Sequence, residues 1–407
     1  MKIGIIGLGK LGYPVALAIK DKGHEVFGFD TNEATMQMIR DRKITYQEAG
    51  AEELIKKHEL NLVPMSFVVD NSDIIFLAIQ TPHDPKYEGV TEIPSERADF
   101  DYTYLKKAVA DLAEQASLRK TKITVVIIST VLPGTIEREI KPLLGEYVDL
   151  CYNPFFIAMG TVIADFVNPE FVLLGVESEE AAKKVKEFYA TIHSKPIAEM
   201  PIIDAELTKV SYNTFIGMKI VFVNTLMEIC EKNGGNVDNV TDALKLATDR
   251  LISPKYLTAG MGDGGGCHPR DNIAMSYLAK KLDLSHNLFE DIMKARENQT
   301  KWLADEIQKA HKMTGLPVVI LGREFKPETN LDIGSPSRLL SSVLEISHEL
   351  AERTDPIPES PHIFFIGTKH AQYSKVKFPY GSVVIDPFRY IPKQNGVFVI
   401  NLGNSHE

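Results

Sequence analysis

Short apolar runs alternate with segments of helical pattern along the first half of the chain. Five runs have the length and apolar character of buried strands: residues 2–6, 24–30, 73–82, 122–130 and 171–177. Strands that alternate with helices are typical of a doubly wound parallel sheet. We therefore predict an N-terminal α/β domain of this kind over residues 1–200.

A long segment without proline follows these strands. Residues 204–232 are apolar around much of the circumference of the predicted helix. Such a helix is buried on more than one side, so it forms either a spine between domains or a subunit interface. Further helices are predicted near 236–250 and 271–314, and together they form a central long-helix domain over residues 201–314.

Strand patterns return after Gly315. The runs "LPVVILG", "HIFFIGT" and "SVVID" predict a smaller C-terminal α/β domain over residues 315–407. A chain of 407 residues exceeds one ordinary hydrophobic core, which agrees with three domains.

The composition is that of an ordinary globular protein, with 44% hydrophobic and 25% charged residues. A formal net charge of −10 disfavours general nucleic-acid binding, because no basic stripe is available to neutralise phosphates. Three cysteines without framework spacing favour a reducing compartment. The first glycine comes too early for a signal-peptide core, and no apolar run has the length of a membrane helix. We expect a cytoplasmic protein that does not bind membranes.

A glycine-rich turn joins the first predicted strand to the first predicted helix. Gly7, Gly9 and Gly12 form G-x-G-x-x-G, with Leu11 inside the turn, and the second strand ends at Asp30. In this context the pattern is the fingerprint of a Rossmann dinucleotide-binding domain. The glycines allow a tight turn and the approach of a pyrophosphate to the helix N-terminus, and the carboxylate accepts hydrogen bonds from ribose hydroxyls. An acid at this position favours NAD over NADP.

Two further pairs of residues have a chemical and a plain structural interpretation. Thr81 and Thr130 follow strands at the edge where such sheets bind ligands, although threonines there also serve ordinary turns. Lys209 and Asn213 lie four residues apart and share one face of the long helix. A lysine on a helix is usually solvated, so the spacing alone leaves both interpretations open.

The stretch "GMGDGGGCHPRD", residues 260–271, places one of the three cysteines behind a glycine run. A zinc site is disfavoured, because Cys151 and Cys230 stand alone without a paired ligand. Glycines let the backbone approach a ligand closely, and Pro269 is suited to the first turn of a helix.

Cys267 then lies just ahead of a helix N-terminus. The helix dipole favours the thiolate there, which lowers the pKa and increases reactivity at neutral pH. Asp271, four residues on, shares a helix face with this cysteine. A glycine hinge with an incidental cysteine is the alternative, and the stretch alone does not separate the two.

Taken in order, these motifs resemble the UDP-glucose and GDP-mannose dehydrogenases, a family of nucleotide-sugar 6-dehydrogenases. The resemblance extends over nearly the whole chain. It rests on the fingerprint and on these further matches: "TP" at 81–82, "STV" at 129–131, "NP" at 153–154, "DFVNPEFVLLG" at 165–175, "AELTKVSYNTF" at 205–215, "YLTAGMGDGGGCHPRD" at 256–271 and "LGREFKPET" at 321–329.

The resemblance implies a defined reaction. Family members oxidise the C6 alcohol of the sugar to a carboxylate with two NAD molecules, and a cysteine holds the intermediate. Cys267 would form a thiohemiacetal and then a thioester with the sugar, which water hydrolyses. Lys209 and Asn213 would stabilise the oxygen on C6, Asp271 would position Lys209 or a water, and Thr130 would border the nicotinamide.

The resemblance also implies the binding residues and the assembly. The expected cofactor-binding residues are Gly7, Gly9, Leu11, Gly12, Asp30, Thr81, Thr130 and Arg270. The expected substrate-binding residues are Lys209, Asn213, Arg250, Tyr256, Leu257, Gly260, Gly264 and Lys326. Arg250 corresponds to a position that family dimers lend across their interface, so a homodimer through the 204–232 helix is expected. No metal is expected.

Several positions depart from the family pattern. The family has two glutamates in N-P-E-F-L-x-E, one of which activates the hydrolytic water, whereas this chain has Phe155 and Met159. Ile333 stands where the family has a cofactor-binding arginine, Asp263 replaces an aromatic residue, and Arg270 replaces a lysine. The third domain is expected to be shortened after residue 350 and to lack a strand that ends in Asp-Pro.

Two alternatives to a four-electron dehydrogenase follow from these departures. Loss of both glutamates favours a two-electron alcohol dehydrogenase on the same scaffold, which has no need of Cys267. A non-catalytic protein that binds nucleotide sugars or NAD is the second alternative. Retention of Lys209, Asn213, Cys267 and Asp271 together argues against it.

Overall fold

The computed structural model describes residues 1–82, 98–120, 122–253, 259–262, 275–276, 278–329, 332 and 334–403. The chain divides into two compact units, Met1–Gly217 and Met218–Glu407, each described by itself. The boundaries of the three expected domains, 1–200, 201–314 and 315–407, stay a prediction.

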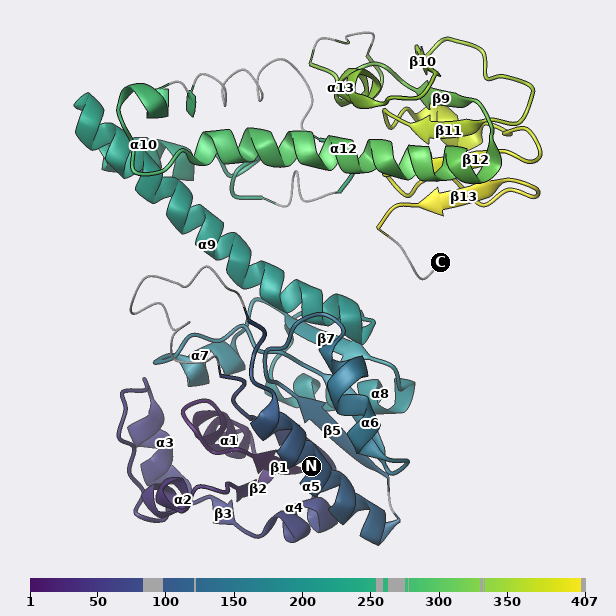
Figure 1. Ribbon diagram of the computed structural model, residues 1–407. Coiled ribbons are helices and arrows are strands. Elements are labelled where there is room, and N and C mark those ends of the chain that lie inside the picture. Colours follow the sequence, from purple (N-terminus) through teal and green to yellow (C-terminus); the bar gives the residue numbers. More distant parts are fainter. Residues whose placement is uncertain are drawn as a thin grey trace. The chain divides into compact units, whose positions relative to one another are not determined.

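The first unit contains an eight-stranded sheet in the order β3-β2-β1-β4-β5-β6-β7-β8 (Figure 1). Every neighbouring pair is parallel except β6 and β7, which are antiparallel. The strands are β1 (Lys2–Ile6), β2 (Glu25–Phe29), β3 (Asn61–Leu62), β4 (Ile74–Leu77), β5 (Ile123–Ile127), β6 (Val148–Tyr152), β7 (Val172–Val176) and β8 (Ile197–Met200). The predicted doubly wound Rossmann sheet is confirmed.

Helices cover both faces of this sheet because its central strands are apolar on both sides. In β5, Ile123, Val125 and Ile127 point to one face, whereas Val126 points to the other. The first face packs against α4 (Met65–Asn71), α5 (Thr103–Arg119), the π-helix η2 (Ile136–Ile140) and α6 (Lys141–Leu144). The second packs against α1 (Gly12–Asp21), α2 (Glu33–Arg40), α3 (Ala51–Lys57), α7 (Val162–Val167) and α8 (Glu179–Ile192).

The predicted long helix is confirmed as α9 (Ile202–Asn233), a single helix of 32 residues. Its first turns pack against the first unit through Ile202 and Ala205. Farther along, it leaves large apolar side chains exposed in the single chain, among them Met218 at 61% and Met227 at 54%. The helices α10 (Val237–Lys245) and α12 (Leu288–Thr314) follow in the described part of the chain.

The second unit contains a five-stranded parallel sheet in the order β10-β9-β11-β12-β13 (Figure 1). Its strands are β9 (Val318–Leu321), β10 (His348–Ala351), β11 (Ile363–Ile366), β12 (Val383–Asp386) and β13 (Phe398–Asn401). The helix α13 (Pro336–Val343) and the last turns of α12 cover one face, and a short 3₁₀ helix, Ala371–Lys375, packs on the other. The expected smaller C-terminal α/β fold is confirmed.

The expected shortening of this domain after residue 350, with loss of a family strand that ends in Asp-Pro, stays a prediction. The run "SVVID" predicted a strand of its own, and that strand is confirmed as β12, which ends at Asp386 with Pro387 after it.

Among the described helices, none combines the length and the apolar character that crossing a bilayer requires.

Candidate active site

The glycine turn stands at the carboxyl end of β1, where α1 begins. Gly7 has φ +93°, and a Cβ there would lie 2.4 Å from the carbonyl oxygen of Ala78. A Cβ on Gly12 would lie 1.9 Å from the carbonyl oxygen of Gly7, whereas a Cβ on Gly9 would meet no atom within 4 Å. Backbone atoms of the protein lie too close to Gly7 and Gly12 for either to carry a Cβ. Gly9 has no such neighbour, so space remains open beside it.

The N-terminus of α1 is free to attract an anion. Its N-cap, Leu11, makes no side-chain capping bond, and the first turn carries no acidic residue. Unsatisfied N–H groups and the helix dipole together favour a phosphate group at such a position.

Asp30 lies at the carboxyl end of β2, beside this turn. Its Oδ2 accepts a hydrogen bond from the N–H of Leu8 at 2.7 Å, and its Oδ1 accepts one from the N–H of Asn32 at 2.8 Å. These bonds fix the orientation of the carboxylate. Each oxygen retains a lone pair for a ribose hydroxyl, and the negative charge opposes a ribose 2′-phosphate.

The loops after β4 and β5 are tied together at the same edge. The Thr81 hydroxyl donates to the carbonyl oxygen of Thr130 at 2.8 Å, and the Ser129 hydroxyl donates to the carbonyl of Ile79. The structure therefore brings together the two threonines that the sequence placed at the ligand edge.

Lys209 is a buried cation on α9, with only 6% of its surface exposed. Its Nζ donates to the carbonyl oxygen of Phe155 at 2.7 Å and lies 4.8 Å from the ring centroid of Phe156. Burial lowers the pKa of this ammonium group, and within the described part of the chain no carboxylate forms an ion pair with it. Burying such a charge is costly, so Lys209 is a candidate for contact with a ligand oxygen.

Asn213, one turn farther along α9, is exposed. Its neighbour Tyr212 packs on Phe156 with ring centroids 4.5 Å apart, and the Tyr212 hydroxyl donates to Glu170 at 3.2 Å. The loop after β6 is thus held against the helix that carries Lys209 and Asn213.

Glu206 is a site residue that sequence reasoning missed. It lies one turn before Lys209 and is 1% exposed, and its two carboxylate oxygens accept hydrogen bonds from the N–H groups of Gly134 and Ile136 at 2.5 and 2.7 Å. Burial raises the pKa of this carboxyl, and the two backbone bonds act in the opposite direction. Glu206 therefore ties the loop beyond Thr130 to α9, and its place in "AELTKVSYNTF", three residues before Lys209, is the signal that could have indicated this.

The remaining predicted residues belong to the second unit. Lys326 is exposed on the loop between β9 and α13, Arg250 is exposed beyond α10, and Gly260 contacts the turn after β12. Cys267, Asp271, Arg270, Tyr256, Leu257 and Gly264 lie outside the described residues, as do Asp263 and Ile333.

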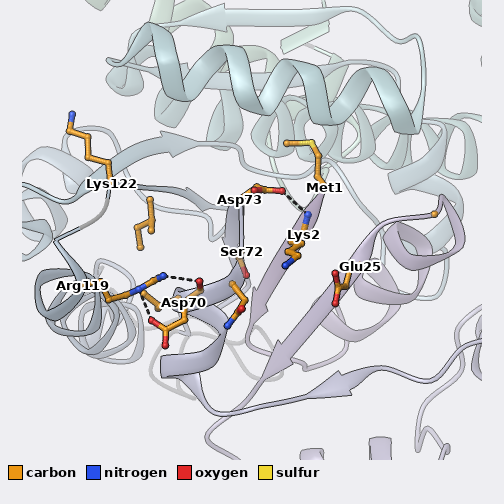
Figure 2. Close-up of a pocket in the computed structure, with 12 residues that line it drawn as sticks. Met1, Lys2, Glu25, Asp70, Ser72, Asp73, Arg119 and Lys122 are labelled. Atoms are coloured by element: carbon orange, nitrogen blue, oxygen red, sulfur yellow. Dashed lines mark hydrogen bonds and ion pairs between the residues drawn. The ribbon is translucent and has the colours of Figure 1, made fainter.

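An open hollow of about 590 Å³ lies at the opposite, amino-terminal edge of the first sheet. Figure 2 shows Arg119 directed at Asp70 and Asp73 bonded to the backbone of Lys2. Because these three side chains already have protein partners, we place the candidate ligand site at the carboxyl edge and not in this hollow.

Comparison with known proteins shows that these features occur together in one protein family. The NAD binding domain of the UDP-glucose/GDP-mannose dehydrogenase family matches residues 1–193, and the central domain of that family matches residues 203–298. UDP-glucose 6-dehydrogenase TuaD of Bacillus subtilis is 30% identical over 390 residues, which cover 92% of this chain and 80% of TuaD. The chain belongs to the UDP-glucose/GDP-mannose dehydrogenase family.

A further relative agrees with this membership, and a solved structure shares the fold. UDP-glucose 6-dehydrogenase AglM of Haloferax volcanii is 27% identical over 81% of this chain and 77% of AglM. A crystal structure of GDP-mannose dehydrogenase from Pseudomonas aeruginosa, in a ternary complex, has the same fold, with a TM-score of 0.87 over 98% of this chain and 99% of that chain at 23% identity.

The family supplies a cofactor and a class of reaction. The matched N-terminal domain binds NAD, and the open room above Gly9, the uncapped N-terminus of α1 and the Asp30 carboxylate fit a dinucleotide without a 2′-phosphate. The protein is an NAD-dependent nucleotide-sugar dehydrogenase. The alternatives of a simple alcohol dehydrogenase and a non-catalytic binding protein are not favoured.

Phe155 and Met159, which we expect to stand in place of two glutamates of the family, have different surroundings. Phe155 is half-buried, and its ring lies 5.7 Å from that of Phe166 within the core on one face of the sheet. Met159 is 64% exposed. A charged side chain could therefore return at residue 159 without disturbing the core, but not at residue 155.

Proposed function

We propose that this dehydrogenase oxidises the C6 alcohol of a UDP-hexose to the uronate, with Cys267 as the covalent nucleophile. The names of TuaD and AglM support a UDP-sugar. The glycine-rich stretch that ends in Cys267, Pro269 and Asp271 supports the covalent route, because a thiolate near a helix N-terminus is the form that attacks an aldehyde.

Lys209 is the observation that carries this proposal. A buried ammonium group that donates a hydrogen bond to a backbone carbonyl and pairs with no carboxylate of the described residues suits an oxygen that gains negative charge during a reaction. We assign Lys209 and Asn213 to the C6 oxygen, Thr130 to the nicotinamide side, and Asp271 to positioning Lys209 or a water. The cofactor-binding set also includes Gly7, Gly9, Leu11, Gly12, Asp30, Thr81 and Arg270.

The proposed reaction removes two hydrides from C6 and adds one water. Removal of a hydride from C6 and a proton from its hydroxyl leaves an aldehyde, and the Cys267 thiolate adds to it to give a thiohemiacetal after protonation of the oxygen. Loss of a second hydride and the hydroxyl proton gives a thioester. Water then adds, the thiolate leaves, and the carboxylate product departs. NAD, when bound, accepts the hydrides, one per molecule.

The second unit supplies the proposed contacts with the sugar nucleotide. We assign backbone N–H groups of Tyr256, Leu257, Gly260 and Gly264 and the side chain of Lys326 to this role. Arg250 would enter the site of a second copy, which requires a homodimer. The large apolar side chains exposed on α9 support such an interface.

The yield of NADH per sugar, together with intact-protein mass spectrometry, tests the proposal. Wild type and Cys267→Ser are incubated with NAD and a panel of UDP- and GDP-sugars. Two NADH per uronate, and a sugar-nucleotide adduct that Cys267→Ser does not form, are the expected results. One NADH per sugar without an adduct would replace the proposal with a two-electron alcohol dehydrogenase, and no turnover would leave a binding protein.

Restoring one family glutamate separates capture of the sugar from hydrolysis of the thioester. We expect Met159→Glu to increase the rate of uronate release by about 10²-fold, in the range of general-base catalysis, and to shorten the lifetime of the adduct. Phe155→Glu is the matched comparison, and we expect it to lower the melting temperature because the charge enters the core beside Phe166. An unchanged release rate in a folded Met159→Glu protein would show that another group already activates the water.

A further inference from the structure

The turn that follows β12 is organised by one buried carboxylate. Asp386 is fully buried, and its Oδ1 accepts a hydrogen bond from the N–H of Phe388 at 2.8 Å. Its Oδ2 accepts bonds from the N–H groups of Tyr390 and Ile391 at 2.6 and 2.8 Å. Asp386 therefore accepts three charge-assisted hydrogen bonds from the backbone just after it, and these bonds fix residues 386–389 in place. We name this segment the Asp386 turn.

Arg389 is the last residue of the turn, and its backbone has φ +57°, a conformation that residues other than glycine rarely adopt. In this conformation its guanidinium donates to three carbonyl oxygens. These belong to Pro387 in the turn, to Leu402 just after β13 at 3.0 Å, and to Ala259 at 2.7 Å. The last bond joins positions 130 residues apart and reaches the stretch that leads into "GMGDGGGCHPRD".

Phe388 contacts the next residue of that stretch. A Cβ on Gly260 would lie 2.6 Å from Cε1 and 2.7 Å from Cδ1 of the Phe388 ring, and the φ of Gly260 is not in the left-handed region. The ring, and not the backbone conformation, therefore requires glycine here. Two residues on, a Cβ at Gly262 would lie 3.6 Å from Cγ of Arg296, which is an ordinary contact.

We infer that the Asp386 turn is a docking platform that fixes the backbone at Ala259 and Gly260 and thereby sets the affinity for the sugar nucleotide. Arg389 and Phe388 act through Gly260, so they are positioning residues and not catalytic ones. This inference rests on the proposed function, in which Gly260 binds the substrate through its backbone. A backbone donor must be held in place before binding if it is to contribute its full hydrogen bond.

Matched glycine substitutions test the platform. We expect Gly260→Ala to raise the KM for the nucleotide sugar about tenfold while the KM for NAD is unchanged, and Gly262→Ala to leave both constants at the wild-type values. Introduced into Phe388→Ala, which lacks the ring, Gly260→Ala should have little further effect. An equal effect of the two glycine substitutions, or a full effect of Gly260→Ala in the Phe388→Ala protein, would overturn the inference.

Hydrogen–deuterium exchange tests the same docking without substrate. In Arg389→Lys the charge is kept, but an ammonium group cannot reach three carbonyls, so the amides of residues 259–262 should exchange faster. Lys393→Ala removes an exposed cation four residues on and should leave this exchange unchanged. If wild type turns over no sugar in the panel, the proposed function fails, and the exchange of Arg389→Lys still decides the platform: unchanged exchange would disprove it.

Discussion

The ammonium group of Lys209 is buried, and burying its charge lowers the free energy of unfolding. Its ammonium is 6% exposed and bonded to the carbonyl of Phe155, and burial holds its pKa below the ordinary value of 10.5. No carboxylate of the described residues pairs with this cation, so its burial costs free energy in the resting protein, and active sites commonly carry such a cost. The charge is then available to an oxygen that becomes negative during the reaction.

Replacing this cation by an apolar side chain should separate stability from activity. We expect Lys209→Met to raise the free energy of unfolding at pH 7 by about 1 kcal/mol and to lower kcat by roughly 10²-fold or more. Urea unfolding and NADH formation measure the two effects. A Met variant that is less stable than wild type would show that the Phe155 bond outweighs the burial of the charge.

The pH dependence of this stability difference has a definite sign. Because the pKa of Lys209 is lower in the folded state, the unfolded state binds more protons between the folded pKa and 10.5. The stability that wild type loses by burying the charge is therefore recovered as the pH rises through this window. The difference in free energy of unfolding between Lys209→Met and wild type should therefore become smaller as the pH rises. A difference that stays constant up to pH 10.5 would contradict a lowered pKa of Lys209 in the folded protein.

At the scale of elements, α9 presents an apolar stripe that the single chain leaves exposed. Leu207, Phe215, Met218 and Phe222 are 54%, 48%, 61% and 37% exposed. Their separations of eight, three and four residues place them within about 80° of one another on the helix. A stripe of this kind on a long helix suits the same stripe of a second copy.

We expect the double variant Leu207→Glu, Met218→Glu to be monomeric at micromolar concentration, because two charges would be buried on each side of the interface. Sedimentation should show a dimer for wild type. Leu118→Glu is the control, since Leu118 is 74% exposed on α5 and belongs to no stripe on α9, and it should remain a dimer. A monomeric wild type would disprove the homodimer and the role of Arg250 in a partner's site.

Strand prediction succeeded for interior strands and failed mainly at edges. The unpredicted strands are β3, β6, β8, β10 and β13, and all of them except β6 are the outermost strands of their sheets. An edge strand is covered on fewer sides and needs no continuous apolar run, as the half-exposed residues of β8 and β13 illustrate. β6 combines two partly exposed residues with a buried end, which obscured its pattern.

At the scale of the whole molecule, the division into two units separates cofactor binding from the proposed covalent chemistry. The glycine turn, Asp30 and Lys209 belong to the first unit, whereas Cys267 and Lys326 belong to the second. Each unit also has its own cores on both faces of its own sheet. The first unit should therefore fold and bind NAD by itself.

We expect NAD at about 100 times its Kd to raise the melting temperature of a fragment of residues 1–217 by about 5 to 10 °C. NADP is the control and should produce a much smaller shift, because its 2′-phosphate meets the Asp30 carboxylate. Scanning fluorimetry measures both shifts. Equal shifts with NADP would contradict the role of Asp30, and formation of two NADH per sugar by the fragment would contradict the role of Cys267.

The sequence by itself determined the features that depend on near neighbours along the chain: the glycine fingerprint with its acidic residue, the interior strands, the long helix and the shared face of Lys209 and Asn213. The tertiary structure decided which distant residues meet. The bonds from Lys209 to Phe155 and from Arg389 to Ala259 join positions 54 and 130 residues apart. Local patterns carry no record of such partners, because the order of strands in a sheet and the register of its loops bring them together only on folding.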